Sequence, residues 1–193
     1  MLHRLLLGVF TVASLSLAGC ALSPQQLEPQ PLLNGPLMAV GQGQPVSVKV
    51  VDGRPSPVLG SRGGLYAETS NITVNGQTLL PRLQAQADAG VRLLGFTPTP
   101  NAYNAPQITL TLAELTYQSP KDGSYVTEAN IKAVFRADVQ NNGRRYSGRY
   151  SAALNQRFGM APNEETNSKL VSDVLSDALT RVFKDQSIGQ ALR

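Results

Sequence analysis

The sequence predicts an α+β fold in which a mostly antiparallel sheet of about four to five strands carries two helices on one face. Three observations predict this fold. Several short runs alternate apolar and polar side chains, as strands do. Two of these runs meet at Asn142-Gly143, a dipeptide that favours a tight hairpin. Two other segments carry apolar residues at helical spacing on one side only, so each helix should lie on the sheet.

The first strands are predicted from alternation and β-branched residues. Valines alternate with polar side chains at residues 46–50, which are expected to form a strand that ends at the turn residues 52–55. A glycine-rich loop is expected at residues 60–64. A further short strand should follow at residues 71–75.

A helix and a longer strand are expected next. Thr78 can N-cap a helix that stops near Gly95, and Pro81 is tolerated in its first turn. Apolar side chains then alternate from Ile108. Their phase shifts near Ala113-Glu114, which indicates a β-bulge.

The hairpin at Asn142-Gly143 fixes a register. A two-residue loop sets Asn141 opposite Arg144. One face then carries only apolar or small pairs, which are Val139–Tyr146, Ala137–Gly148, Phe135–Tyr150, Ala133–Ala152 and Ile131–Leu154. On the other face Glu128 lies opposite Arg157. That second face should also carry Val126, Val134 and Ala153, and a continuous apolar patch there would mark an interface.

A final helix is expected after Pro162. Asn163 can cap it, and Glu164 and Glu165 place carboxylates at its positive end. Its apolar side chains recur at helical spacing and are Val171, Val174, Leu175, Ala178, Val182 and Phe183.

Residues 1–19 have the pattern of a secretory signal peptide. A short basic start at residues 1–4 precedes an apolar run at residues 5–16, and small residues follow. The apolar run is shorter than the about 20 residues that span a bilayer. We therefore expect residues 1–19 to be removed.

The four residues Leu17, Ala18, Gly19 and Cys20 resemble the lipobox of bacterial lipoproteins. In that class the cysteine thiol receives a diacylglycerol, and the chain is cleaved just before this cysteine. The resemblance implies that Cys20, the only cysteine, is the lipid attachment site. Ala21 follows it, where lipoproteins retained in the inner membrane of enteric bacteria often carry Asp. The outer membrane is therefore the expected destination.

Residues 20–45 are expected to form a lipidated tether rich in Pro, Gln and Gly. Its frequent prolines remove hydrogen-bond donors that helices and sheets need. The remaining residues, 46–193, should fold as a single periplasmic α+β domain, because they are numerous enough to bury a core.

The composition excludes several kinds of chemistry. Signal-peptide removal takes away His3, the only histidine, and lipidation uses Cys20. The mature chain would then lack the histidine of common serine hydrolases and the usual zinc ligands. We expect no metal site, no cofactor and no catalytic residue. The net charge is +4 for the full sequence and falls to about +3 once Arg4 is removed. In the envelope this charge would face anionic lipid and cell-wall polymer, so no nucleic-acid partner is expected.

Three sets of residues are weighed as sites. Asp52 could be the acid of a glycan-acting enzyme, but this needs a second carboxylate across a groove, and a turn with Arg54 explains it otherwise. The glycines at 60–64 lack the spacing of a phosphate-binding loop. A candidate partner surface consists of the arginines of the hairpin, which are Arg144, Arg145, Arg149 and Arg157.

Over nearly its full length the chain resembles the YajG family of bacterial lipoproteins. The likeness is carried in order by the lipobox, Val46 to Val50 with Asp52-x-Arg54, Gly95-Phe96, Leu115-x-Tyr117, the hairpin with Tyr146 and Tyr150, and Asp185-Gln186-Ser187-Ile188. It implies an envelope lipoprotein with a small α+β domain. It brings no catalytic residues.

The sequence therefore predicts an outer-membrane lipoprotein, held at the periplasmic face by its lipid anchor. Its non-catalytic domain is expected to bind a protein or a cell-envelope component such as peptidoglycan. Two alternatives stay open. One is a carboxylate-dependent enzyme that acts on envelope glycans, and the other is a structural spacer without a specific ligand.

Overall fold

The computed structural model describes residues 22–64, 67–100, 102–119 and 127–193. The signal peptide, the lipobox and Cys20 lie outside the described residues, as do Val126 and most of the turn expected after Gln118. The elements in chain order are β1 (Gln25–Leu27), β2 (Pro45–Asp52), β3 (Val58–Ser61), the 3-10 turn η1 (Ala67–Thr69), β4 (Asn71–Val74), α2 (Gly76–Leu93), β5 (Thr97–Pro98), β6 (Gln107–Gln118), β7 (Thr127–Asn141), β8 (Arg144–Phe158), α3 (Glu164–Lys184) and α4 (Gln186–Leu192).

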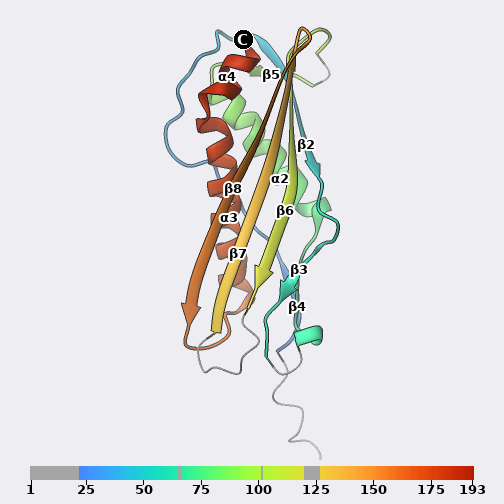
Figure 1. Ribbon diagram of the computed structural model, residues 1–193, viewed down its shortest axis with the longest axis vertical. Coiled ribbons are helices and arrows are strands. Elements are labelled where there is room, and N and C mark those ends of the chain that lie inside the picture. Colours follow the sequence, from blue (N-terminus) through green and yellow to red (C-terminus); the bar gives the residue numbers. More distant parts are fainter. Residues whose placement is uncertain (1–21, 65–66, 101, 120–126) are drawn as a thin grey trace, which may run out of the picture.

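The predicted fold class is wrong in its strand count, strand directions and helix count. The described residues form a mixed sheet of eight strands, and three α-helices lie against it (Figure 1). The additional strands β1, β3 and β5 have three, four and two residues. Such runs are too short to show an alternating pattern in the sequence. The additional helix α4 starts directly after α3, where the sequence analysis expected no separate helix.

The sheet is organised around β6. Antiparallel β7 pairs with one edge of β6, and β8 pairs with β7 beyond it. On the other edge, β2 runs parallel to the first half of β6, from Ser47 opposite Gln107 to Asp52 opposite Leu112. Further along, β3 takes over at Gly60 opposite Tyr117, and β4 and β1 follow outward. The predicted bulge is confirmed as a register shift between Leu112 and Glu114, at the point where the neighbour changes.

The predicted hairpin is confirmed in every pair. Asn141 lies opposite Arg144, and the register continues to Glu128 opposite Arg157. Asn142 and Gly143 have φ values of 48° and 80°, the left-handed conformation that this two-residue turn requires. The hairpin therefore brings β7 and β8 together over fifteen residues each.

Both long helices begin at asparagine caps. The Asn163 side chain accepts the Thr166 N–H at 2.8 Å, as predicted for α3. The first helix starts earlier than predicted, because Asn75 rather than Thr78 caps it and accepts the Gln77 N–H at 2.9 Å. Pro81 falls inside the first turns of α2.

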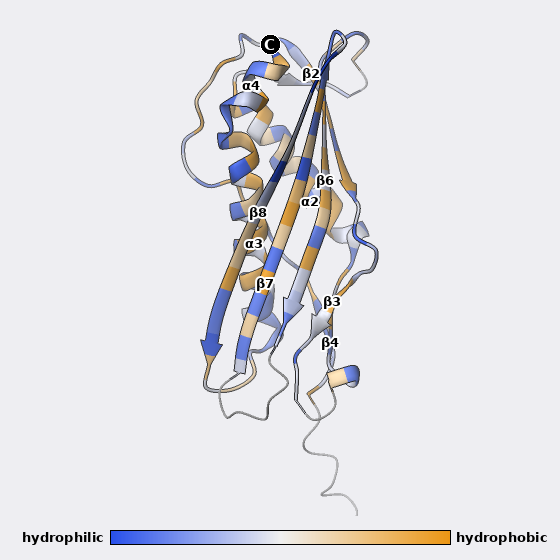
Figure 2. Cartoon of the chain, in the orientation of Figure 1, coloured by the Kyte–Doolittle hydropathy of each residue, from blue (hydrophilic) through white to orange (hydrophobic). Residues whose placement is uncertain are grey.

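The core lies between the sheet and the helices. Inward side chains of β6 and β7, such as Leu110 and Phe135, are fully buried with Val174 and Phe183 of α3 and Leu83 of α2. Figure 2 shows hydrophilic and hydrophobic bands alternating along β7, as expected for a sheet with one packed face. The opposite face carries the polar side chains.

The segment expected as a tether packs against the helices instead. Leu27 in β1 is fully buried, and Glu28 of the same segment forms an ion pair with Arg82 of α2 at 2.8 Å. Four backbone N–H groups of this segment donate to four hydroxyls of α3. The bonds are Glu28 to Ser168 (3.3 Å), Gln30 to Ser172 (2.8 Å), Leu32 to Ser176 (2.9 Å) and Asn34 to Thr180 (3.1 Å).

These four hydrogen bonds, here called the hydroxyl ladder, have a simple geometric reason. Two residues of extended chain advance about 6 to 7 Å, and four residues of an α-helix advance about 6 Å, so the two repeats match. Pro29 and Pro31 lie between the donating residues, at positions where the ladder needs no N–H group. The prolines that predicted a free tether are therefore compatible with a docked one. Described residues from Gln25 onward thus belong to the folded body.

Candidate functional site

Asp52 is held by an arginine and is not a free acid. Arg54 donates to both carboxylate oxygens of Asp52, at 2.8 and 2.7 Å, and the Arg54 side chain is 2% exposed. These hydrogen bonds lower the pKa of Asp52 despite its partial burial, so the carboxylate is ionised at neutral pH. A general acid needs the opposite shift. The pair connects the end of β2 to the end of β4, since Arg54 also donates to the Val74 carbonyl at 3.2 Å.

The glycine-rich stretch contributes packing. Gly60 lies in β3, and a Cβ atom there would be 1.8 Å from the Tyr117 carbonyl oxygen. Glycine is therefore required at position 60, because the backbones of β3 and β6 are in close contact there. Glu164 and Glu165 lie in the first turn of α3, as expected for helix-start carboxylates.

A buried polar network joins residues 22–34, here called the chain start, to α3. Tyr117 donates its hydroxyl to the Asn167 side-chain oxygen at 3.0 Å, and the Asn167 amide donates to Gln25 at 2.7 Å. Burial raises the pKa of Tyr117 to about 12, so this hydroxyl stays protonated. Arg62 donates to the carbonyls of Ser23 and Pro162, both at 3.0 Å. The network is satisfied mainly by internal partners, which is typical of a structural role.

A second cluster joins the hairpin to the helices. Tyr146 and Tyr150 of β8 both donate to one oxygen of Asp185, at 2.7 and 2.6 Å. The other oxygen accepts the Ser187 N–H at 2.8 Å and so caps α4. Burial alone would raise the pKa of Asp185, but the two tyrosine hydroxyls outweigh it and hold the pKa at about 2. Burial and the neighbouring carboxylate raise the pKa of Tyr150.

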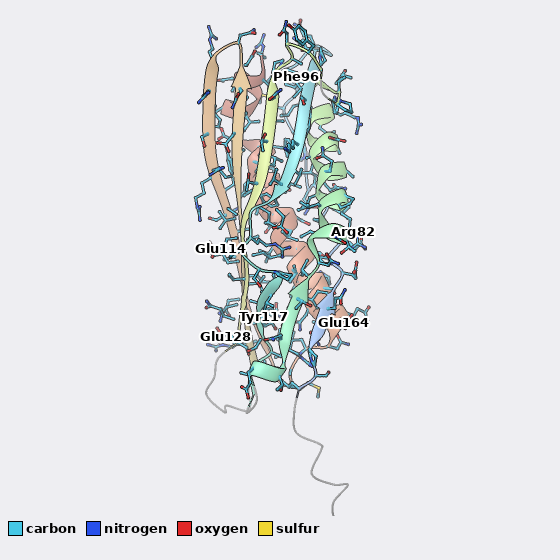
Figure 3. All side chains as sticks on the ribbon, turned by 90° about the vertical axis from the view of Figure 1, so that its right-hand side faces the viewer. Arg82, Phe96, Glu114, Tyr117, Glu128 and Glu164 are labelled. Carbon is cyan, nitrogen blue, oxygen red and sulfur yellow. The ribbon has the colours of Figure 1, made fainter. Side chains whose placement is uncertain are left out.

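The sheet face away from the helices is polar and ion-paired. Glu114 pairs with Lys132 at 3.0 Å and with Arg149 at 3.6 Å, while Glu128 pairs with Arg157 at 3.4 Å. Figure 3 labels Glu114 and Glu128 on this side and Arg82 on the helix side. Hydrogen bonds, first from Asn155, lower the pKa of Glu128.

The apolar patch considered for this face is not found among its described residues. Val134 is fully buried opposite Ser151, whereas Ala153 is exposed. A shallow depression of about 490 Å³ on this face is lined largely by polar side chains, including Glu114, Lys132 and Asn155.

The four arginines of the candidate partner surface do not form one cluster. Arg145 and Arg157 are separated by twelve positions of one strand, which is about 40 Å. Arg149 and Arg157 have the carboxylate partners given above. By contrast, among the described residues no carboxylate side chain lies within ion-pair distance of Arg144 or Arg145. The structure thus singles out the two arginines next to the turn.

These two arginines border a pocket of about 340 Å³, here called the tip pocket. Its lining residues come from the hairpin end and from α4, and they are Asn141, Arg144, Arg145, Tyr146, Ser187, Gln190, Ala191 and Arg193. The Asn141 amide donates to the Ala191 carbonyl at 3.1 Å and fixes α4 against the hairpin. The tip pocket therefore combines exposed guanidinium groups with few acidic neighbours, an arrangement suited to anions.

The sequence did not reveal the contribution of α4 to the tip pocket. Arg193, Ser187 and Gln190 are far from Arg144 in the chain, and only the packing of α4 on β7 and β8 brings them together. The only sequence signal was Asp185, a capping residue followed by apolar Ile188 and Leu192, which marks a separate helix.

The described part of the chain offers no group of three or more His, Cys, Asp or Glu side chains that could hold a metal ion. Within the same residues no helix has both the length and the apolar character to cross a membrane.

The chain belongs to a family of uncharacterized lipoproteins, since a family model with that description matches residues 31–193. The resemblance to YajG-type lipoproteins is consistent with this membership and is confirmed at the level of the family. No curated protein matches the chain.

Several solved structures are similar in fold. An uncharacterized protein with 12% identity has a TM-score of 0.50, and the match covers 85% of this chain and 99% of that chain. Protein XCC0632 from Xanthomonas campestris has 16% identity, a TM-score of 0.43 and coverage of 89% and 94%. A minor lipoprotein from Acinetobacter baumannii has 12% identity, a TM-score of 0.42 and coverage of 77% and 90%. At these identities the first likeness supports the fold alone.

Proposed function

We propose that the protein is a lipoprotein anchored through Cys20 in the outer membrane, and that its periplasmic domain binds a protein or cell-envelope component at the tip pocket. The observation that carries this proposal is that Arg144 and Arg145, which have no carboxylate side chain as a partner among the described residues, lie beside a pocket. Family membership supports the lipoprotein part of the proposal.

The location of the tip pocket supports a role in reaching a partner. The first described strand, β1, pairs with β4 at the end of the molecule opposite the hairpin turn and the C-terminus (Figure 1). An anchor attached just before Leu22 would leave the tip pocket at the free end. The ionised, arginine-bound state of Asp52 supports binding rather than acid catalysis.

The binding part is tested by site-specific photo-crosslinking in intact envelopes. A benzophenone amino acid replaces Gln190, an exposed residue of the tip pocket, and a control chain carries it at Met160, which is 81% exposed near the other end. Adducts specific to position 190 that disappear in an Arg144→Gln, Arg145→Gln chain would support the proposal. Co-sedimentation with purified peptidoglycan sacculi distinguishes polymer from protein. Equal adducts at both positions, or no adduct and no co-sedimentation, would contradict it.

The anchoring part is tested separately by palmitate labelling and density fractionation. The full-length chain should be labelled and should sediment with outer membranes. A Cys20→Ser chain should lose the label and the membrane association. Label retained in Cys20→Ser would refute the assignment of the lipid site.

A further inference from the structure

The long strand β8 has one paired edge and one open edge. All fifteen residues from Arg144 to Phe158 pair with β7, and no other described strand pairs with β8. In Figure 1, β8 forms the margin of the sheet, and the helices lie behind it. Typical strands have about five or six residues, and proteins usually shield long edges with prolines, bulges or short strands. β8 has no proline and no register shift in its pairing with β7.

The register shows which backbone groups are available on this edge. The residues that flank a two-residue turn exchange both hydrogen bonds, so Asn141 and Arg144 form such a pair. Antiparallel pairs then alternate, and even-numbered residues of β8 direct their N–H and C=O groups to β7. Odd-numbered residues, from Arg145 to Arg157, direct theirs outward, and all of them are exposed.

The side chains of these odd-numbered residues lie on the face away from the helices. Positions 145, 149, 153 and 157 follow one another at intervals of four residues. Three of them carry arginine, and position 153 carries a small alanine. On β6, β7 and β8 this face carries the cations Lys132, Arg136, Arg145, Arg149 and Arg157 and the acids Glu114, Glu128 and Asp138. The surplus is positive, and Arg145 at its edge has no carboxylate partner among the described residues.

Charge determines which strand this edge would accept. Opposite charges on directly paired strands stabilise a sheet, and like charges destabilise it. A second copy in antiparallel pairing about Ser151 would place Arg145 opposite Arg157, which is unfavourable. A strand with carboxylates opposite the arginines would be favoured. The small side chains of Ser147, Ser151 and Ala153 leave room for larger neighbours.

We propose that an extended acidic segment of a partner protein adds to the open edge of β8 as a further strand, with carboxylates opposite Arg145 and Arg149. This inference rests on the proposed function, in which the domain is a binding module. It specifies the partner as protein and the binding mode as β-strand addition, in which main-chain hydrogen bonds supply affinity and side chains supply specificity.

The test uses a backbone variant that acts only on the open edge. Ser151→Pro removes an outward N–H group without removing a donor to β7, and an edge strand tolerates proline at such a position. Ser151→Ala keeps the N–H group and is the matched control. The probe is a short fluorescein-labelled peptide in which Glu alternates with Val, and a second peptide carries Lys in place of Glu. Both are titrated into the full-length lipidated protein in detergent.

The Glu peptide should bind wild type and Ser151→Ala alike, and Ser151→Pro at least about tenfold more weakly. Bound peptide should protect the outward amides of β8 from hydrogen exchange. A chain with Arg145→Glu and Arg149→Glu should lose the Glu peptide and bind the Lys peptide, which provides a test that does not depend on folding of the proline variant.

Three results would overturn the inference. The first is equal binding of the Glu peptide to Ser151→Pro and Ser151→Ala. The second is equal binding of both peptides to the wild type. The third is a dimer that Ser151→Pro dissociates, because it would assign the edge to a second copy. If position 190 still forms specific adducts in such a case, the proposed function stands and only strand addition fails. If those adducts are absent while the Glu peptide binds, strand addition stands and the proposed binding at the tip pocket is contradicted instead.

Discussion

Asp185 joins three elements through a single carboxylate. One of its oxygens accepts both tyrosine hydroxyls of β8, and the other caps α4 directly after α3. Its pKa of about 2 lies below the ordinary value of 3.8. A depressed pKa means that the stabilisation is complete above about pH 4 and is lost as the pH falls from about 4 to about 2.

Asp185→Asn should therefore lower the free energy of unfolding by about 1 to 3 kcal/mol at pH 7, because the tyrosines lose a charged acceptor. The difference from wild type should shrink toward pH 2, where about half of the Asp185 side chains are protonated. Denaturant unfolding at several pH values measures both effects. Asp177→Asn, at an exposed position of α3, is the control and should change stability little. An undiminished difference at pH 2 would show that charge is not the cause.

Gly60 is the position at which a single methyl group should be most costly. A Cβ atom there would lie 1.8 Å from a backbone oxygen of β6, and backbone cannot rotate aside as a side chain can. We expect Gly60→Ala to cost about 3 kcal/mol or more, because β3 must leave β6. Gly159→Ala, where no atom lies within 4 Å of the added carbon, should remain within about 0.5 kcal/mol of wild type. Denaturant unfolding of both variants checks this, and similar costs would contradict it.

At the scale of elements, local patterns predicted the hairpin, but they did not predict that the chain start packs against α3. The register of β7 and β8 followed from Asn142-Gly143 and alternation, because turn chemistry and side-chain period act between neighbours in sequence. The docking of residues 28–34 depends on hydroxyls of α3 far along the chain. In the sequence those hydroxyls only mark a polar side of a helix. The parallel pairing of β2 with β6 is likewise non-local.

The same distinction applies to the candidate site. Arg144 and Arg145 could be selected from the sequence because the hairpin places them together. Their separation from Arg149 and Arg157 depends on the carboxylates of β6 and β7, whose side-chain contacts the sequence does not show.

The hydroxyl ladder predicts local protection of the chain start. Replacing both Ser172 and Ser176 by Ala removes the acceptors of the Gln30 and Leu32 amides and leaves good helix formers in α3. Those two amides should exchange with solvent about tenfold faster or more, while buried amides of α3 keep their protection. Hydrogen exchange resolved by NMR measures this. Asp173→Ala, on the exposed side of α3, is the control, and unchanged exchange in the double variant would contradict the ladder.

At the scale of the whole molecule, docking of the chain start limits how far the domain can move from its proposed anchor. Five residue steps separate Cys20 from Gln25, which is at most about 18 Å of extended chain. β8 alone is about 50 Å long, and it runs from the tip pocket to the end of the molecule where β1 and β4 lie (Figure 1). If Cys20 carries the lipid, one end of the sheet stays close to the bilayer and the hairpin turn is held away from it.

Energy transfer to a labelled bilayer tests this orientation. A dye at Gln140→Cys, an exposed position near the turn, should transfer weakly to acceptors in the lipid head groups, because it should lie about 50 Å or more away. A dye at Met160→Cys, beyond the other end of β8, should transfer strongly. Lipidation of Cys20 would leave each introduced thiol as the single labelling site. Equal transfer from both positions would mean that the molecule lies along the membrane, and the tip pocket would then face lipid rather than the periplasm.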